Sequence, residues 1–307
     1  MGAVAIEVTD LRKSYGAVEA VRGISLTVAE GEVFALLGPN GAGKTTTVEI
    51  LEGFRRRDAG NVSVLGFDPA KGERRLKDQL GIVLQTSGVD PYLTVAETVD
   101  MFRGYYPKPR PRDEVIELVG LTEKKDARVT KLSGGQQRRL DVAIALAGDP
   151  RLLFLDEPTS GFDPGARRNA WEVIKNLAGL GKTIFLTSHQ MDEVQYLADR
   201  VAIIAAGRIV AEGTPDTLAG REKAAAIVRF QLPSGAMELP ERLRAGARVD
   251  GSSVELESKD PTRTLYDLTS WAVQAGISLE GLQVMRPSLE DVYLEITQDV
   301  AAAEAKP

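Results

Sequence analysis

The stretch VFALLGPNGAGKTT, residues 33–46, decides the fold of this chain. It opens with an apolar run of strand length, and the residues that follow match the phosphate-loop pattern of glycine, any four residues, then Gly-Lys-Thr. Glycines let the backbone wrap closely around phosphate oxygens, and the helix that begins after such a loop adds positive potential. The stretch therefore predicts a strand–loop–helix unit that binds phosphates through Gly38, Asn40, Gly41, Ala42, Gly43, Lys44, Thr45 and Thr46.

Two side chains of this loop have specific expected roles. Lys44 is expected to reach the β- and γ-phosphates of a nucleotide, and the Thr45 hydroxyl is expected to ligate Mg²⁺. The alternative is a glycine-rich turn with an incidental lysine. The apolar run before the loop and the helical pattern after it disfavour that alternative.

An apolar segment that ends in two acids supplies the second half of the expected site. Residues 152–157 read LLFLDE. At the carboxyl edge of a parallel sheet, Asp156 is expected to hold Mg²⁺ through water, and Glu157 to polarise the attacking water. Acids at strand ends are common, so the pair carries weight because it follows a phosphate loop in the chain.

The order of apolar and mixed segments predicts an α/β fold with a largely parallel central sheet. Nearly continuous apolar runs are typical of strands that helices cover on both faces. The expected strands are residues 33–37, 81–84, 152–156, 183–187 and 201–204, and the expected helices are residues 44–52, 95–104, 134–147, 164–180 and 191–198.

Composition narrows the function classes. The 307 residues include 38 Lys+Arg, 44 Asp+Glu, one histidine and no cysteine, with a formal net charge of -6. Without cysteine, disulfides, thiolate zinc sites and cysteine nucleophiles are excluded. The net negative charge disfavours phosphate-driven binding of nucleic acid. No stretch reaches the roughly 18 apolar residues of a spanning helix, so we expect any membrane function to need a second chain that spans the membrane.

Two further regions interrupt or follow the α/β pattern. A mostly helical insert is expected from about residue 91, and its loop GYYPKPRPR, residues 104–112, is either a contact for lipid headgroups or a partner, or a solvated linker. The pattern changes after Gly213-Thr214-Pro215. The expected domains are residues 1–215 with the helical insert at about 91–147, a small C-terminal α+β domain at 216–300, and a frayed tail at 301–307.

The sequence LSGGQ, residues 132–136, resembles the signature of the ATP-binding subunits of ABC transporters. A Ser-Gly-Gly helix start presents free N–H groups, a hydroxyl and a dipole to an anion. The resemblance covers about residues 4–215, and it implies a P-loop ATPase core with a helical signature subdomain. It also implies that two copies sandwich two ATP molecules, each site joining one chain's phosphate loop to the partner's Ser133, Gly134, Gly135 and Gln136.

The same resemblance implies roles for four other residues. Tyr15 resembles the aromatic that stacks on adenine, and Gln85 resembles the glutamine that senses Mg²⁺ and the γ-phosphate. Asp163 resembles the aspartate that reaches across the dimer, and His189 resembles the histidine that hydrogen-bonds the γ-phosphate. Phe162 stands where the family more often has leucine, a difference expected to affect packing rather than chemistry.

Two stretches resemble the daunorubicin-resistance type of drug exporter, DEPTSGFDPGARR at residues 156–168 and MRPSLEDVYL at residues 285–294. This implies an ATPase that powers export of a drug, lipid or other amphiphile through a separate permease at the cytoplasmic face of the membrane. A soluble ABC-type ATPase acting on ribosomes or chromosomes is one alternative, and a regulatory nucleotide-binding module is another. The single cassette and the lack of sustained heptads disfavour the first, while Glu157 and His189 disfavour the second.

A coupling surface is expected where the nucleotide site meets the insert. Gln85 is followed by a short turn, so a segment held by the γ-phosphate at one end can convert nucleotide occupancy into movement. We expect residues 86–103 to receive a short cytosolic helix of the permease, with Tyr92, Leu93 and Phe102 as anchors. Alternatively, these three side chains form the insert's own core.

Overall fold

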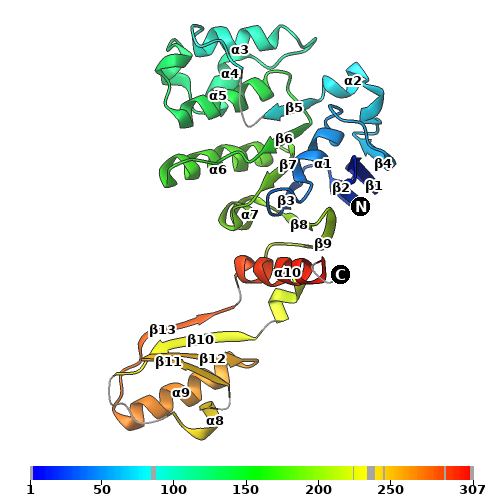
Figure 1. The fold of residues 1–307 in the computed structure, drawn as a ribbon. Helices are drawn as coiled ribbons and strands as arrows, with labels where there is room; N and C mark the ends of the chain where they lie inside the picture. Colours follow the sequence, from blue (N-terminus) through cyan, green and yellow to red (C-terminus); the bar gives the residue numbers. More distant parts are fainter. Residues whose placement is uncertain are drawn as a thin grey trace. The chain divides into compact units, whose positions relative to one another are not determined.

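The computed structural model describes residues 3–83, 88–223, 225–233, 239–244, 246–286 and 288–304. The chain divides into two compact units, one formed by residues 1–215 together with 299–307, and the other by residues 216–298 (Figure 1).

A six-stranded sheet forms the centre of the first unit, in the order β5-β6-β7-β3-β8-β9. Its strands are β3 (Val33–Leu37), β5 (Leu80–Val83), β6 (Leu152–Asp156), β7 (Thr183–Ser188), β8 (Arg200–Ala205) and β9 (Arg208–Gly213). The first five in that order are parallel, and β9 is antiparallel to β8. The α/β class expected from the sequence is confirmed. Leu84, the last residue of one expected strand, lies outside the described residues.

The helices of this unit begin and end within a residue or two of the expected bounds. They are α1 (Lys44–Leu51), α3 (Val95–Arg103), α5 (Gly134–Leu146), α6 (Pro164–Gly179) and α7 (Met191–Leu197). Three of them, α3, α5 and α6, start after a residue whose side chain caps the helix. Thr94 and Ser133 make capping boxes, and Asp163 caps α6 ahead of Pro164.

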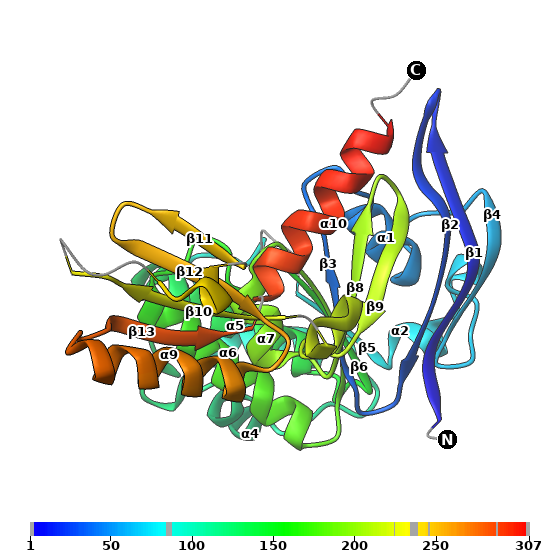
Figure 2. The same cartoon turned by 90° about the horizontal axis from the view of Figure 1, so that it is seen from below.

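A second sheet was not anticipated from the sequence. The strands β1 (Val4–Tyr15), β2 (Val18–Ala29) and β4 (Ala59–Val64) form an antiparallel sheet in the order β2-β1-β4, which Figure 2 shows along one side of the unit. These strands mix polar and apolar residues, and several bulges shift their register, so strict alternation is lost. Their apolar side chains nevertheless build one core with α1 and the central sheet.

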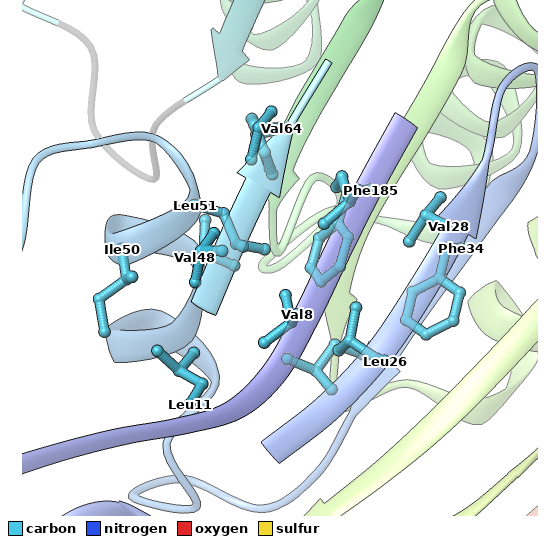
Figure 3. Packing of buried hydrophobic residues seen from close by; sticks show 14 of the residues in the cluster. Val8, Leu11, Leu26, Val28, Phe34, Val48, Ile50, Leu51, Val64 and Phe185 are labelled. Atoms are coloured by element: carbon cyan, nitrogen blue, oxygen red, sulfur yellow. The ribbon is translucent and has the colours of Figure 1, made fainter. Parts of the chain in front are cut away.

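That core fixes the position of the phosphate loop. Figure 3 shows Val8 and Leu26 beside the helix that carries Val48 and Leu51. The rings of Phe34 and Phe185, from neighbouring strands, stack with their centroids 5.5 Å apart. Because both ends of the loop are anchored in fully buried side chains, β3 and α1 hold it in a defined shape.

The helical insert contains α3, α4 (Arg112–Leu118) and α5, with short 3₁₀ turns at Thr122–Lys124 and Val129–Lys131. The basic side chains of the 104–112 loop face carboxylates of the same unit: Arg110 pairs with Glu114 and Asp149, and Arg112 with Asp100 and Asp113. These pairs favour the linker interpretation over a lipid contact. The remaining short elements before the insert are α2 (Arg74–Lys77) and a 3₁₀ turn at Pro69–Lys71.

The second unit is a small α+β structure, as expected. Four antiparallel strands lie in the order β11-β12-β10-β13, and α9 (Pro261–Ala275) covers a core of Val228, Phe230, Val254, Leu256 and Leu268. The strands are β10 (Ala226–Gln231), β11 (Ala247–Asp250), β12 (Ser253–Ser258) and β13 (Glu280–Met285). The 3₁₀ segment η4 (Leu218–Lys223) precedes β10, and α8 (Glu241–Arg244) lies between β10 and β11.

The last helix is longer than expected. α10 runs from Leu289 to Glu304, so it includes residues that the sequence analysis had placed in a frayed tail. Its alanine-rich end explains the extension, because alanine is the best helix former. Among the described residues, no helix has both the length and the apolar character that crossing a membrane requires.

Candidate nucleotide-binding and hydrolysis site

The phosphate loop takes a shape that only glycine allows at two of its positions. A Cβ atom at Gly38 would lie 2.3 Å from the carbonyl oxygen of Ile204. Gly43 has a φ of 105°, and a Cβ atom there would lie 2.4 Å from the carbonyl oxygen of Ala20. The loop backbone therefore passes too close to β8 and β2 for any larger residue, and it turns directly into α1 through Gly43.

Lys44 lies inside this loop and is only 6% exposed. Its Nζ donates to the carbonyl oxygens of Gly38 at 2.6 Å and Pro39 at 3.1 Å. Burial lowers the pKa of Lys44, and the carboxylates of Glu157 and Asp156 partly oppose this shift. The ammonium group is thus held at the centre of the loop.

A cavity of about 150 Å³ opens at the loop. Its lining residues are Ala20, Asn40, Gly41, Gly43, Lys44, Thr45, Thr46 and Glu157. The structure therefore brings the phosphate loop and the second of the two acids to one cavity, although they are more than a hundred residues apart in the chain. Thr45 lines this cavity, and Asp156 precedes Glu157 in the chain without lining it. A threonine hydroxyl and a carboxylate are hard oxygen ligands of the kind that Mg²⁺ prefers, so their chemistry fits this ion.

Thr187 contacts the carboxylate of Asp156 and the backbone N–H of Glu157, and it was not identified from the sequence. In the parallel pairing of β6 with β7, Asp156 lies opposite Thr187. The Thr187 hydroxyl donates to Asp156 Oδ1, while the Glu157 backbone N–H lies 3.2 Å from both the hydroxyl and the carbonyl oxygen of Thr187. Glu157 adopts a φ of 46°, the left-handed region that non-glycine residues rarely occupy. Only the strand register could have identified this threonine.

His189 lies directly beside Glu157. Its Nδ1 is 3.1 Å from Glu157 Oε1, and the two side chains are 45% and 14% exposed. Two residues that sequence reasoning proposed separately thus form one contact at the rim of the cavity.

Tyr15 is 41% exposed and lies close to the loop. Its hydroxyl is 3.4 Å from Thr46 Oγ1. The cations of Arg55 and Lys13 lie 5.2 and 5.6 Å from its ring centroid. An exposed ring at the edge of a phosphate site can stack on a base, because stacking requires only a π face.

The signature residues lie away from the phosphate loop of their own chain. Ser133 begins α5, accepts from the Gln136 backbone N–H at 3.3 Å and is exposed, as is Gly134. Figure 1 shows α5 well separated from α1, and none of Ser133, Gly134, Gly135 and Gln136 lines the cavity at the loop.

Of the two remaining residues expected from the sequence, the structure describes Asp163 but not Gln85. Asp163 is exposed, and its carboxylate accepts from the backbone N–H groups of Gly165 and Ala166 at 2.9 Å, so within this chain it caps α6. Gln85 lies outside the described residues. Sequence reasoning also missed Arg138, which extends from α5 and donates to the carbonyl oxygens of Asp156 at 3.0 Å and Pro158 at 3.2 Å.

Comparison with known proteins agrees with this geometry. A family model described as "ABC transporter" matches residues 21–160, and one described as "ABC transporter domain-containing protein-like, C-terminal domain" matches residues 226–288. A Nod factor export ATP-binding protein I of Rhizobium sp. (strain N33) is 39% identical over 97% of this chain and 98% of its own length. A daunorubicin resistance ATP-binding protein of Streptomyces coeruleorubidus is 36% identical over 97% and 96% of the two chains.

Solved structures resemble the first unit. The structure of cbiO1 from Clostridium perfringens, part of the ABC transporter complex cbiONQ, matches 70% of this chain and 90% of its own with a TM-score of 0.63 and 28% identity. The resemblance inferred from LSGGQ and from the two longer stretches is therefore confirmed. The Nod factor and daunorubicin relatives are 39% and 36% identical to this chain over at least 96% of either sequence. The chain therefore belongs to the ATP-binding proteins of the ABC transporter family.

Proposed function

We propose that this chain is the ATP-hydrolysing subunit of a membrane exporter and works with a separate permease chain. The observation that carries the proposal is the cavity in which the phosphate loop faces Glu157, with His189 in contact with that carboxylate. Similar chains are named for Nod factor export and for resistance to daunorubicin, which favours export of a drug, lipid or other amphiphile.

Each residue at the cavity has its own role in the hydrolysis of ATP. The backbone N–H groups of the loop and the ammonium of Lys44 hold the phosphates and offset their negative charge. Glu157 takes the proton of the water that attacks the γ-phosphorus, while Thr187 holds the Glu157 backbone N–H and His189 contacts the carboxylate. Thr45 and Asp156 would hold Mg²⁺, which when bound would offset the negative charge of the phosphate oxygens.

The exposed start of α5 supports assembly of two copies around ATP. Ser133, Gly134, Gly135 and Gln136 leave a helix N-terminus open to solvent, away from the loop of their own chain. Such a terminus attracts phosphate. We infer that it contacts the γ-phosphate bound to a second copy, with Asp163 reaching across the same interface and Tyr15 stacking on adenine.

The surface of residues 86–103, of which the structure describes 88–103, is proposed to receive the permease. Tyr92 is 75% exposed, so it does not belong to the insert's core, whereas Leu93 and Phe102 are half-buried. Phe102 lines a cavity of about 290 Å³ between the insert and β5. An exposed aromatic side chain and a cavity-lining aromatic side chain within one segment are typical of a docking surface.

Purification from native membranes tests this function. An affinity tag on this chain is expected to retain a membrane protein with several spanning helices, and vesicles that contain both chains are expected to accumulate substrate only with hydrolysable ATP. Co-purification with ribosomes or chromosomal DNA, and no membrane protein, would instead support the soluble alternative.

A further inference from the structure

We propose that Glu52 binds a cationic side chain, arginine or lysine, of the permease segment that docks between the insert and α1. The inference rests on the proposed function and deepens it, because it names the chemistry that the partner must present.

The cavity beside the docking surface has one acid in its wall. It has a volume of about 290 Å³ and is lined by Glu52, Phe54, Lys77, Leu80, Ile82, Phe102, Tyr106, Ile144 and Ala145. Figure 1 shows β5, which supplies Leu80 and Ile82, between the helices of the insert and α1. Glu52 follows the last residue of α1, so its carboxyl group lies where the nucleotide-binding helix meets this cavity.

Glu52 differs from the other buried acids of the first unit. Glu32 pairs with Arg200, Asp141 with Arg138, and Glu193 accepts from Thr159 and Trp171. Glu52 is only 7% exposed as a residue, its carboxyl oxygens are not fully enclosed, and among the described residues no hydrogen bond or ion pair engages them. An acid in a largely apolar cavity wall is poorly solvated, so a charged group brought into that cavity by another molecule can complete the site.

The charges around Glu52 favour a cation over a neutral donor. Burial first, then the carboxylates of Asp156 and Glu49, raise the pKa of Glu52 to about 8. A cation placed at the carboxyl group would relieve both the burial and the repulsion. Tyr106 and the apolar side chains in the wall offer no positive charge.

Two basic residues of this chain lie near enough to be considered. Arg55 is held by Glu49, whose carboxylate its Nε contacts at 2.5 Å. Lys77 lines the cavity but is exposed, and within the structure it makes no ion pair with Glu52. We therefore assign the complementary positive charge to the permease. Lys77 is the alternative partner for Glu52, and the variant Lys77→Gln tests it.

The experiment uses the intact transporter, purified through a tag on this chain, and measures how much permease is retained. Glu52→Gln keeps the shape and removes the group that ionises against a bound cation, and it is expected to lower the retained permease by at least about tenfold, since a buried cation left without its partner is costly. Glu117→Gln removes a charge from the exposed face of α4 and serves as the control, with retention unchanged.

A photo-crosslinking residue at Phe54, 68% exposed and in the wall of the cavity, then identifies the permease segment. That segment is expected to carry an arginine or lysine. Its replacement by glutamate is expected to release the permease, and Glu52→Lys in the same complex is expected to restore it.

Unfolding of the isolated subunit separates this role from a structural one. Glu52→Leu is expected to raise the stability of the subunit while it lowers permease retention, because a buried unpartnered acid is replaced by an apolar group. Wild-type retention in Glu52→Gln, an equal loss in Lys77→Gln, or a crosslinked segment without a basic residue would each overturn the inference. A wild-type chain that retains no membrane protein at all would instead overturn the proposed function.

Discussion

Thr187 is fully buried in β7, opposite Asp156 of β6, and contacts both acids. Thr187→Val removes the hydroxyl that donates to Asp156 and leaves the volume unchanged. We expect kcat to fall by roughly 10- to 100-fold, the effect typical of a residue that orients a metal ligand. Nucleotide affinity is expected to stay near the wild-type value, because no phosphate contact is lost.

Steady-state ATP hydrolysis and equilibrium binding of a fluorescent ATP analogue check this expectation. Thr183→Val is the matched control at the other end of the same strand, where the hydroxyl accepts from the Gly31 N–H at 2.9 Å. It is expected to cost about 1 kcal/mol of stability and to leave kcat within about twofold. Equal loss of kcat in both variants would show that Thr187 acts through strand stability alone.

Glu52 gives the isolated subunit a defined pH dependence. Its pKa is raised to about 8 in the folded chain from an ordinary value near 4.5, so the folded state binds the proton more tightly than the unfolded state. The free energy of unfolding therefore falls as pH rises from about 4.5 to 8, by roughly 3 kcal/mol at pH 7 at most. Urea unfolding at pH 5.5, 7 and 8.5 is expected to show a flatter profile for Glu52→Gln, whereas Glu117→Gln keeps the wild-type slope.

At the scale of elements, continuous apolar runs were the reliable signal. The strands β3, β6 and β7 are buried on both faces apart from Asp156 at the end of β6, so their other residues are apolar or small and the runs could be identified directly. The antiparallel sheet of β1, β2 and β4 left no such pattern, because its strands are bulged and half-exposed. The acids were likewise predictable from their place at a strand end, whereas Thr187 depends on the register between β6 and β7.

The turn from β3 into α1 depends on backbone shape as much as on side chains. Gly43→Ala would place a Cβ atom 2.4 Å from the Ala20 carbonyl oxygen at a φ of 105°. We expect it to lower stability by roughly 1–3 kcal/mol and ATP affinity by at least about tenfold. Gly181→Ala, at a φ of 79° but in open space, is the control. It is expected to cost about 1 kcal/mol and to leave ATP affinity unchanged, as measured by calorimetry.

At the scale of the whole molecule, the exposed α5 terminus predicts that ATP joins two copies. In a Glu157→Gln background, which slows hydrolysis, Mg²⁺-ATP is expected to convert monomer to dimer in sedimentation. Ser133→Arg is expected to block this conversion, because it places a bulky side chain where the partner's phosphate would bind. A dimer that forms equally well without nucleotide would contradict ATP as the sole link between the two copies. It would instead indicate a contact through the second unit.

The hydrolysis rate of Glu157→Gln shows whether Glu157 is the proton acceptor for the attacking water. The carboxylate faces the phosphate loop across one cavity and contacts His189, so its loss removes the proton acceptor and leaves the phosphate contacts in place. We predict that the variant binds Mg²⁺-ATP about as well as the wild type. We also predict that it hydrolyses ATP roughly 10²- to 10⁴-fold more slowly, the usual effect of losing a general base. Wild-type turnover in a folded, ATP-binding Glu157→Gln protein would contradict it.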